Sequence, residues 1–203
     1  ACIQDYDALL VRGRTKVTAD VMAATSNLKV VGRAGVGVDN IDLAAAQKQG
    51  ITVVNTPTAT TNAVAEHTLA LMLSLIRWVP KADMTMKSGQ WAKKHLQGSE
   101  LYKKTLGIIG LGNIGSAVAD RAAAFGMRVV GFDPIFSDED MRQRGAEPLP
   151  LANLYAQADM ITLHIPLMPK TRNLIDGQAI AQMKRGVRIV CAARGGVIDE
   201  TAL

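Results

Sequence analysis

Short apolar runs alternate with amphipathic stretches along the whole chain. Runs rich in β-branched residues predict buried parallel strands, here at 8–11, 28–31, 51–54, 106–109, 127–132, 160–163 and 187–191. The stretches between them predict helices, at 19–25, 41–49, 62–78, 81–87, 114–125, 138–144, 151–157 and 177–184. Because strand and helix alternate, we expect an α/β protein whose parallel sheets carry helices on their faces.

Capping residues and proline help to set the helix limits. Thr18 is placed to cap the first predicted helix, and Asp39 or Asn40 to cap the second. The long helix at 62–78 has apolar residues on more than one face, and Pro80 limits it. We expect this helix to join two lobes, a first lobe at 1–77 and a second at 78–203.

The most informative stretch is a glycine loop between a predicted strand and a predicted helix. Gly110, Gly112 and Gly115 form a GxGxxG pattern directly after the strand at 106–109. Gly110 permits the tight turn, Gly112 leaves room for a pyrophosphate beside the backbone, and Gly115 lets the helix pack closely on the strand. The helix amino terminus adds a positive dipole end, worth about 0.3–1 kcal/mol towards an anion.

An acidic residue completes this βαβ unit. Asp133 ends the next predicted strand, at about the 20-residue spacing where an acid accepts hydrogen bonds from the adenosine ribose. Its carboxylate would repel a 2′-phosphate, and Pro134 and Ile135 offer no arginine to bind one, so we expect NAD and not NADP. The alternative is a glycine-rich turn of another α/β protein with Asp133 at a solvated strand end. Strand, glycines, helix, second strand and acid in this order favour dinucleotide binding.

The amino-acid composition argues against several other classes of function. Aromatic residues make up 4% of the chain and the net charge of +5 is spread along it, which does not suit a nucleic-acid surface. The most apolar stretch, 63–79, is interrupted by charged residues, so we expect no membrane span. Cys2 and Cys191 lie far apart and outside any CxxC motif, so we expect no disulfide framework and no metal site. With no targeting pattern at the amino terminus, we expect a reducing, cytoplasmic location.

In open α/β sheets, ligands bind beyond the carboxyl ends of the strands. The segments that follow the predicted strands are therefore the candidates for chemistry. These segments are Arg12, Gly35 to Gly37, Asn55 to Thr60, His164 to Pro166 and Ala192 to Gly196.

Six motifs in order resemble those of the D-2-hydroxyacid dehydrogenases. They are Val-Gly-Arg-Ala-Gly-Val-Gly-Val-Asp-Asn at 31–40, Asn-Thr-Pro at 55–57, Ala-Glu-His-Thr at 65–68, the glycine loop at 110–115, His-Ile-Pro-Leu at 164–167 and Ala-Arg-Gly-Gly-Val-Ile-Asp-Glu at 193–200. The resemblance covers nearly the whole chain. It implies a two-lobed fold, with a Rossmann NAD-binding domain and a partial flavodoxin-like substrate domain.

The resemblance also implies a reaction. It is the reversible oxidation of an (R)-2-hydroxy acid by NAD, with 3-phosphoglycerate as the expected substrate, in serine biosynthesis. Glyoxylate, hydroxypyruvate or lactate are alternative substrates, and formate a more distant one. A corepressor-like protein that senses NAD on the same fold is a non-enzyme alternative. Members of this family are usually dimers or tetramers, so the resemblance implies a homodimer or homotetramer. The apolar helix at 62–78 is a candidate for part of the subunit contact.

Site roles follow from the same resemblance. Arg194 is the implied catalytic residue, because a guanidinium can clamp the substrate carboxylate and polarise the reacting oxygen. Arg12 is implied to bind the substrate phosphate, with a solvated loop arginine as the alternative. Backbone N–H groups of Gly35, Val36 and Gly37 would hold the substrate carboxylate. The implied cofactor contacts are Val36, Gly110, Gly112, Asn113, Ile114, Gly115, Asp133, Ile165, Ala192, Ala193 and Arg194.

Some features depart from the family pattern. Cys191 stands where the family usually has Asn, and Thr60 where many relatives have an Asn that touches substrate. We interpret His164 as a histidine at a strand end and His67 as a packed helix residue, and neither as the acid/base. The family's catalytic histidine and its glutamate partner lie downstream of the Arg-Gly-Gly motif. We therefore expect these 203 residues to be an internal segment that by itself binds NAD weakly and turns over almost nothing.

Overall fold

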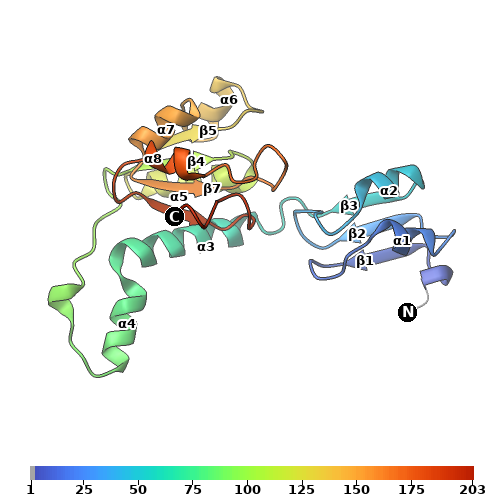
Figure 1. Ribbon diagram of the computed structural model, residues 1–203, viewed down its shortest axis with the longest axis horizontal. Coiled ribbons are helices and arrows are strands. Elements are labelled where there is room, and N and C mark those ends of the chain that lie inside the picture. Colours follow the sequence, from blue (N-terminus) through green and yellow to red (C-terminus); the bar gives the residue numbers. More distant parts are fainter. Residues whose placement is uncertain (1–2) are drawn as a thin grey trace. The chain divides into compact units, whose positions relative to one another are not determined.

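A computed structural model describes residues 3–203, and Cys2 lies outside the described residues. The chain forms two compact units, Ala1–Thr61 and Asn62–Leu203 (Figure 1). Each unit contains its own parallel sheet, so each is described by itself.

The first unit is built on a three-stranded parallel sheet in the order β1-β2-β3. A buried cluster that includes Val11, Met22 and Val31 packs the two helices of this unit against the sheet. The elements in chain order are the 3-10 helix η1 (Ile3–Asp5), β1 (Ala8–Val11), α1 (Ala19–Ala23), β2 (Val30–Arg33), α2 (Leu43–Lys48) and β3 (Thr52–Asn55).

The second unit contains a five-stranded parallel sheet in the order β6-β5-β4-β7-β8. This order runs outward in both directions from the first strand of the unit, as in a doubly wound dinucleotide-binding domain. Its elements are α3 (Thr61–Arg77), α4 (Val79–Lys87), η2 (Lys93–His95), β4 (Thr105–Ile109), α5 (Asn113–Ala124), β5 (Arg128–Phe132), α6 (Asp138–Gln143), β6 (Glu147–Pro148), α7 (Leu151–Gln157), β7 (Met160–Leu163), α8 (Gly177–Ala181) and β8 (Arg188–Cys191).

The central strands β4 and β7 of the second sheet are buried on both faces, which explains why they are mostly apolar. Along β4, Leu106 and Ile108 enter one core cluster and Ile109 enters the other, since successive side chains point to opposite faces. The first cluster includes residues of α3 and α5, and the second includes residues of α7 and α8. Figure 1 accordingly shows α3 and α7 on opposite sides of the sheet.

The long helix α3 belongs to the second unit. Leu69, Met72 and Ile76 are buried in the same cluster as residues of β4 and α5. The compact units therefore divide at Thr61, whereas the predicted lobes divide after residue 77. Within residues 3–203, no helix is both long enough and apolar enough to cross a membrane.

Several predicted boundaries were wrong in detail. The second helix is capped by Asp42, whose carboxylate accepts the Ala45 N–H at 2.9 Å, and not by Asp39 or Asn40. The predicted cap Asn40 instead donates to two backbone carbonyls of the loop after β1. The two-residue strand β6 was not predicted, and α8 ends three residues earlier than expected, at Ala181.

Candidate functional site

The glycine loop lies between β4 and α5, where the sequence places it. Gly110 has φ +92°, a conformation that favours glycine, and its N–H donates to the Phe132 carbonyl at 2.9 Å. A Cβ on Gly115 would lie 2.0 Å from the Gly110 carbonyl oxygen. Only glycine at this position lets α5 begin so close to the strand end.

The middle glycine has a different role. Gly112 is the N-cap residue of α5, and an added Cβ would meet no atom within 4 Å. The space beside Gly112 is therefore open, at the end of a twelve-residue helix whose dipole favours an anion. This is the arrangement that a pyrophosphate needs.

Asp133 is buried at the end of β5 and holds the glycine loop directly. One carboxylate oxygen accepts the Leu111 N–H at 2.8 Å, and the other accepts the Ile135 N–H at 2.9 Å. The side chain thus faces the loop. Each carboxylate oxygen can accept a further hydrogen bond, so the same group is able to bind a ribose hydroxyl.

A hollow of about 320 Å³ adjoins this carboxylate. Its lining includes Asp133 and Asp138, together with apolar surface from Phe132, Phe136 and Pro148. Apolar walls suit an adenine ring, and two carboxylates disfavour a 2′-phosphate. The hollow therefore fits the adenosine end of NAD better than that of NADP.

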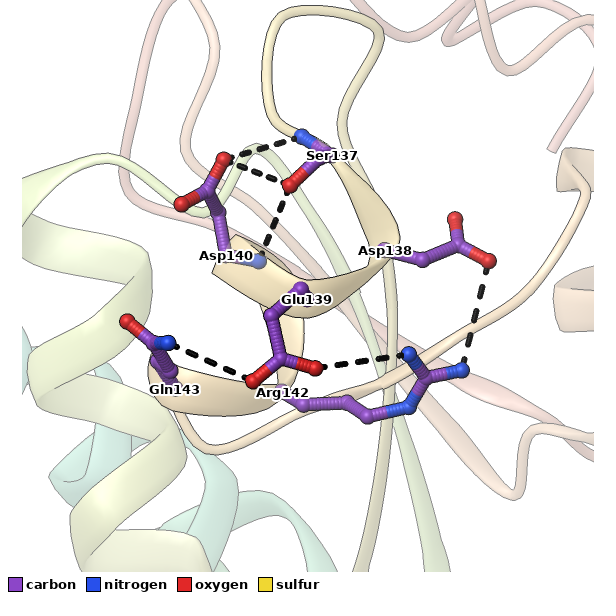
Figure 2. A network of polar contacts seen from close by, with 6 residues as sticks. All are labelled: Ser137, Asp138, Glu139, Asp140, Arg142 and Gln143. Carbon is purple, nitrogen blue, oxygen red and sulfur yellow. Dashed lines mark hydrogen bonds and ion pairs between the residues drawn. The ribbon is translucent and has the colours of Figure 1, made fainter.

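The charged side chains of α6, the helix beside this hollow, form ion pairs and hydrogen bonds with one another and with the cap residue Ser137 (Figure 2). The Ser137 hydroxyl accepts the Asp140 N–H at 3.1 Å, and the Asp140 carboxylate accepts the Ser137 N–H at 3.3 Å, which forms a capping box. The same carboxylate also accepts the Ser137 hydroxyl at 2.6 Å. These bonds from Ser137 lower the pKa of Asp140. Arg142 lies 4.0 Å from the carboxylates of both Asp138 and Glu139, so its charge is directed along the surface of α6.

Arg144 was not identified from the sequence, although it contacts the glycine loop. Its guanidinium donates to the Leu111 carbonyl at 3.2 Å and to the Ser116 hydroxyl at 3.3 Å. It also stacks over the Phe136 ring at 3.9 Å. The Leu111 peptide is consequently held on both sides, by Asp133 at its N–H and by Arg144 at its carbonyl.

The loop after β8 carries the predicted catalytic arginine. Arg194 is partly buried, and its guanidinium donates to the Ala193 carbonyl at 2.9 Å. Residues 191–196 line a hollow of about 320 Å³, together with Ile198 and Glu200. The Cys191 thiol donates to the Arg194 carbonyl at 3.8 Å, so the residue that replaces Asn supports this loop through a weak bond.

Two residues after β7 complete the same edge of the sheet. A Cβ on Gly110 would lie 2.7 Å from the Ile165 side chain, so the predicted adenosine-side residue packs on the glycine loop. His164 lies 3.2 Å from the Thr162 hydroxyl, and burial lowers the pKa of its imidazole from 6.5 to about 4. A neutral histidine in this position agrees with a structural role.

In the first unit, the predicted substrate residues follow β1 and β2. The Asn55 side chain donates to the Val36 carbonyl at 2.6 Å, which fixes the segment Gly35 to Gly37 against the end of β3. Arg12 is exposed, and the Asn40 side chain donates to its carbonyl at 2.9 Å. Asn40 therefore positions the loop that presents Arg12.

Arg33 is a further cation of this edge that was not identified from the sequence. Its guanidinium lies over Gly35, which has φ +147°, so that any added Cβ would overlap it. The buried Nε atom of Arg33 has no hydrogen-bond partner among the described residues. A positive charge thus lies directly beside the backbone N–H groups that were predicted to hold a carboxylate.

The sequence matches a protein family model and several curated proteins. Residues 69–203 match the family model described as D-isomer specific 2-hydroxyacid dehydrogenase, NAD binding domain. The chain is 52% identical over 202 residues to D-3-phosphoglycerate dehydrogenase of Methanocaldococcus jannaschii, covering 99% of this chain and 38% of the relative. It is 50% identical over 201 residues to the Synechocystis enzyme of that name, covering 99% of this chain and 36% of the relative.

Among solved structures, the D-lactate dehydrogenase from Aquifex aeolicus complexed with NAD and lactic acid superposes with a TM-score of 0.90. That match has 33% sequence identity and covers 98% of this chain and 60% of the other. The chain thus spans little more than a third of the length of the curated relatives it matches, which are 36% and 38% covered.

Proposed function

Because the chain belongs to the D-isomer specific 2-hydroxyacid dehydrogenase family, we propose that the intact protein oxidises 3-phosphoglycerate to 3-phosphohydroxypyruvate with NAD. This reaction is the first step of serine biosynthesis. The observation that carries the proposal is the bond from the Leu111 N–H to Asp133, which joins the glycine loop to the acid that selects NAD. The identities of 50% and 52% to D-3-phosphoglycerate dehydrogenases support the choice of substrate.

The described residues fit the cofactor. Open space at Gly112 and the amino terminus of α5 suit the pyrophosphate, and Asp133 suits the ribose. When bound, NAD accepts the hydride that leaves C2 of the hydroxy acid. Ile165 and the segment Ala192 to Arg194 would shield the two ends of the dinucleotide from water.

Substrate recognition is proposed for charged and backbone groups at the strand ends. Arg194 would bind the carboxylate and polarise the reacting oxygen, since a guanidinium forms two parallel hydrogen bonds to a carboxylate. In the first unit, backbone N–H groups of Gly35 to Gly37 would bind a substrate carboxylate, with the charge of Arg33 beside them. Arg12 would bind the phosphate, because it is an exposed cation on a loop fixed by Asn40.

Steady-state kinetics of the intact protein test the substrate. NADH formation would be compared for 3-phosphoglycerate, D-lactate, D-glycerate and glycolate. We expect the highest kcat/KM with 3-phosphoglycerate, and we expect Arg12→Ala to lower it with that substrate by about tenfold or more. The unphosphorylated acids should be affected much less by Arg12→Ala. A preference for D-lactate or glycolate would instead identify another member of the family.

We also propose that the intact protein is a homodimer or homotetramer. Helix α4 has no buried residue, and in Figure 1 it extends away from the five-stranded sheet of its own unit. Large apolar side chains are exposed in and around it, namely Trp78, Val79, Met84, Met86 and Trp91. Such side chains are suited to a contact with a second copy. Light scattering would measure the assembly, and Met84→Glu together with Met86→Glu should shift it toward the monomer.

A cytoplasmic location is part of the same proposal. Cys191 is a free, partly buried thiol, which agrees with a reducing compartment.

A further inference from the structure

A second hollow lies at the opposite edge of the five-stranded sheet from the glycine loop. It has a volume of about 180 Å³ and adjoins the amino ends of β4, β7 and β8. Ile76 of α3 and Met160 of β7 contribute apolar surface to it. The cofactor loop leaves the carboxyl end of β4, so this hollow is separate from the cofactor site.

The polar groups that line this hollow are almost all donors. Its charged side chains are four cations and one carboxylate, namely Lys104, Lys184, Arg185, Arg188 and Asp159. The Ser99 hydroxyl and the Gly186 backbone add neutral polar groups. A small hollow whose lining includes two arginines and two lysines is typical of a site for a phosphate-like anion.

The single carboxylate is already engaged. Asp159 accepts the Lys184 ammonium at 3.0 Å with one oxygen and the Thr105 N–H at 2.8 Å with the other. It therefore neutralises Lys184 and fixes that side chain at the rim of the hollow. It does not lie within ion-pair distance of the other three cations.

Arg185 and Arg188 have no acidic partner among residues 3–203, whereas Lys104 interacts electrostatically with Asp159 without forming an ion pair. Lys104, Arg185 and Arg188 form no ion pair within that part of the chain, whereas Lys29, Lys87 and Arg128 each do. Lys104 and Arg188 are only partly exposed, so their charges are less screened than those of a fully solvated side chain. Asp159 is one negative charge beside four cations, so the positive charges around this hollow repel one another unless a further anion lies between them.

We propose that this hollow is a binding site for a phosphate dianion, held by Lys104, Arg185 and Arg188. The ligand is either free inorganic phosphate or the phosphate group of a monoester. Binding would add a link between three strand ends that are already joined at this edge by backbone hydrogen bonds and by the bonds that Asp159 accepts from Lys184 and Thr105.

Titration calorimetry on the intact protein tests the site, with sodium phosphate replacing sodium chloride at constant ionic strength. A saturating amount of NAD is present, so that phosphate does not enter the cofactor site. We expect saturable binding of one phosphate per chain at this edge. The double variant Lys104→Gln, Arg188→Gln should weaken that binding by about tenfold or more.

Lys170→Gln is the matched control, because it removes one exposed cation from a loop outside the hollow. Circular dichroism checks that each variant is folded, and Arg185→Gln repeats the test at an exposed turn position. Phenyl phosphate replaces inorganic phosphate in a parallel titration, and comparable binding would identify the site as one for monoesters. Absence of phosphate binding to the parent protein, or equal affinity in the parent and the double variant, would overturn the proposal.

Discussion

The carboxylate of Asp133 accepts the backbone N–H of Leu111 at 2.8 Å, across 22 positions of sequence. One residue thereby fixes the glycine loop and supplies the acid for the ribose. We expect Asp133→Asn to raise the Kd for NAD by about five- to thirtyfold, because a charge-assisted bond becomes a neutral one. Binding is measured by quenching of protein fluorescence or by calorimetry.

Asp138→Asn is the control for this prediction. Asp138 lines the same hollow but its carboxylate is 4.0 Å from Arg142 on α6, at the surface. We expect its effect on NAD affinity to be within about twofold. Equal effects of the two variants would show that the bond to Leu111 is unimportant for the cofactor.

Arg144 offers a second test of loop positioning. Arg144→Met should raise the Kd for NAD by about three- to tenfold, because the Leu111 carbonyl loses its charged donor. Arg144→Lys should restore part of the affinity, since an ammonium can reach one of the two acceptors. Arg142→Met, within α6, removes a guanidinium whose ion pairs among residues 3–203 are with Asp138 and Glu139, and it should leave the Kd unchanged (Figure 2).

Substitutions at two glycines of the loop should affect different properties, namely the stability of the fold at Gly115 and the affinity for NAD at Gly112. Gly115→Ala places a Cβ 2.0 Å from the Gly110 carbonyl oxygen, and we expect it to lower the free energy of unfolding by about 1–3 kcal/mol or more. Gly112→Ala meets no atom within 4 Å, so it should unfold like the parent protein yet bind NAD more weakly. Urea unfolding followed by circular dichroism, and NAD titration, measure the two effects. A Gly115→Ala variant as stable as the parent would contradict this packing argument.

His164 should make stability depend on pH. Burial lowers its pKa from 6.5 to about 4, so the unfolded chain binds the proton more tightly than the folded chain does. The stability that neutral His164 gives to the folded protein is fully present above pH 6.5. The free energy of unfolding then falls by about 1–3 kcal/mol as the pH falls towards about 4. His164→Gln should flatten the curve of unfolding free energy against pH in this window. An unchanged slope in His164→Gln would assign the dependence to other groups.

The sequence predicts the strands and the glycine loop well because their signals are local. β1, α7 and β7 have the same limits as the predicted runs, and the buried strands β4 and β7 are mostly apolar. The motif around Gly110 combines a strand, a turn and a helix, and each part is specified by neighbouring residues. Asp133 was identified because its spacing from the glycine loop is characteristic of a dinucleotide-binding βαβ unit.

The residues that were missed depend on tertiary contacts. Arg144 lies at the end of a short polar helix, and its contact with Leu111 spans 33 positions, so no local pattern indicates it. Arg33 belongs to a motif that was identified, but its position over Gly35 follows from the turn conformation at φ +147°. Strand β6 is two residues long and contains Pro148, and it exists only because it pairs with β5.

The exposure of helix α4 should determine how fast its backbone amides exchange with solvent. A nine-residue helix with no buried residue has little intrinsic stability in water. Its backbone protons should therefore exchange rapidly whenever this surface is uncovered, and slowly only when another polypeptide lies on it. Deuterium uptake in this one peptide would thus report the assembly state, while the five-stranded sheet exchanges at the same slow rate in both conditions.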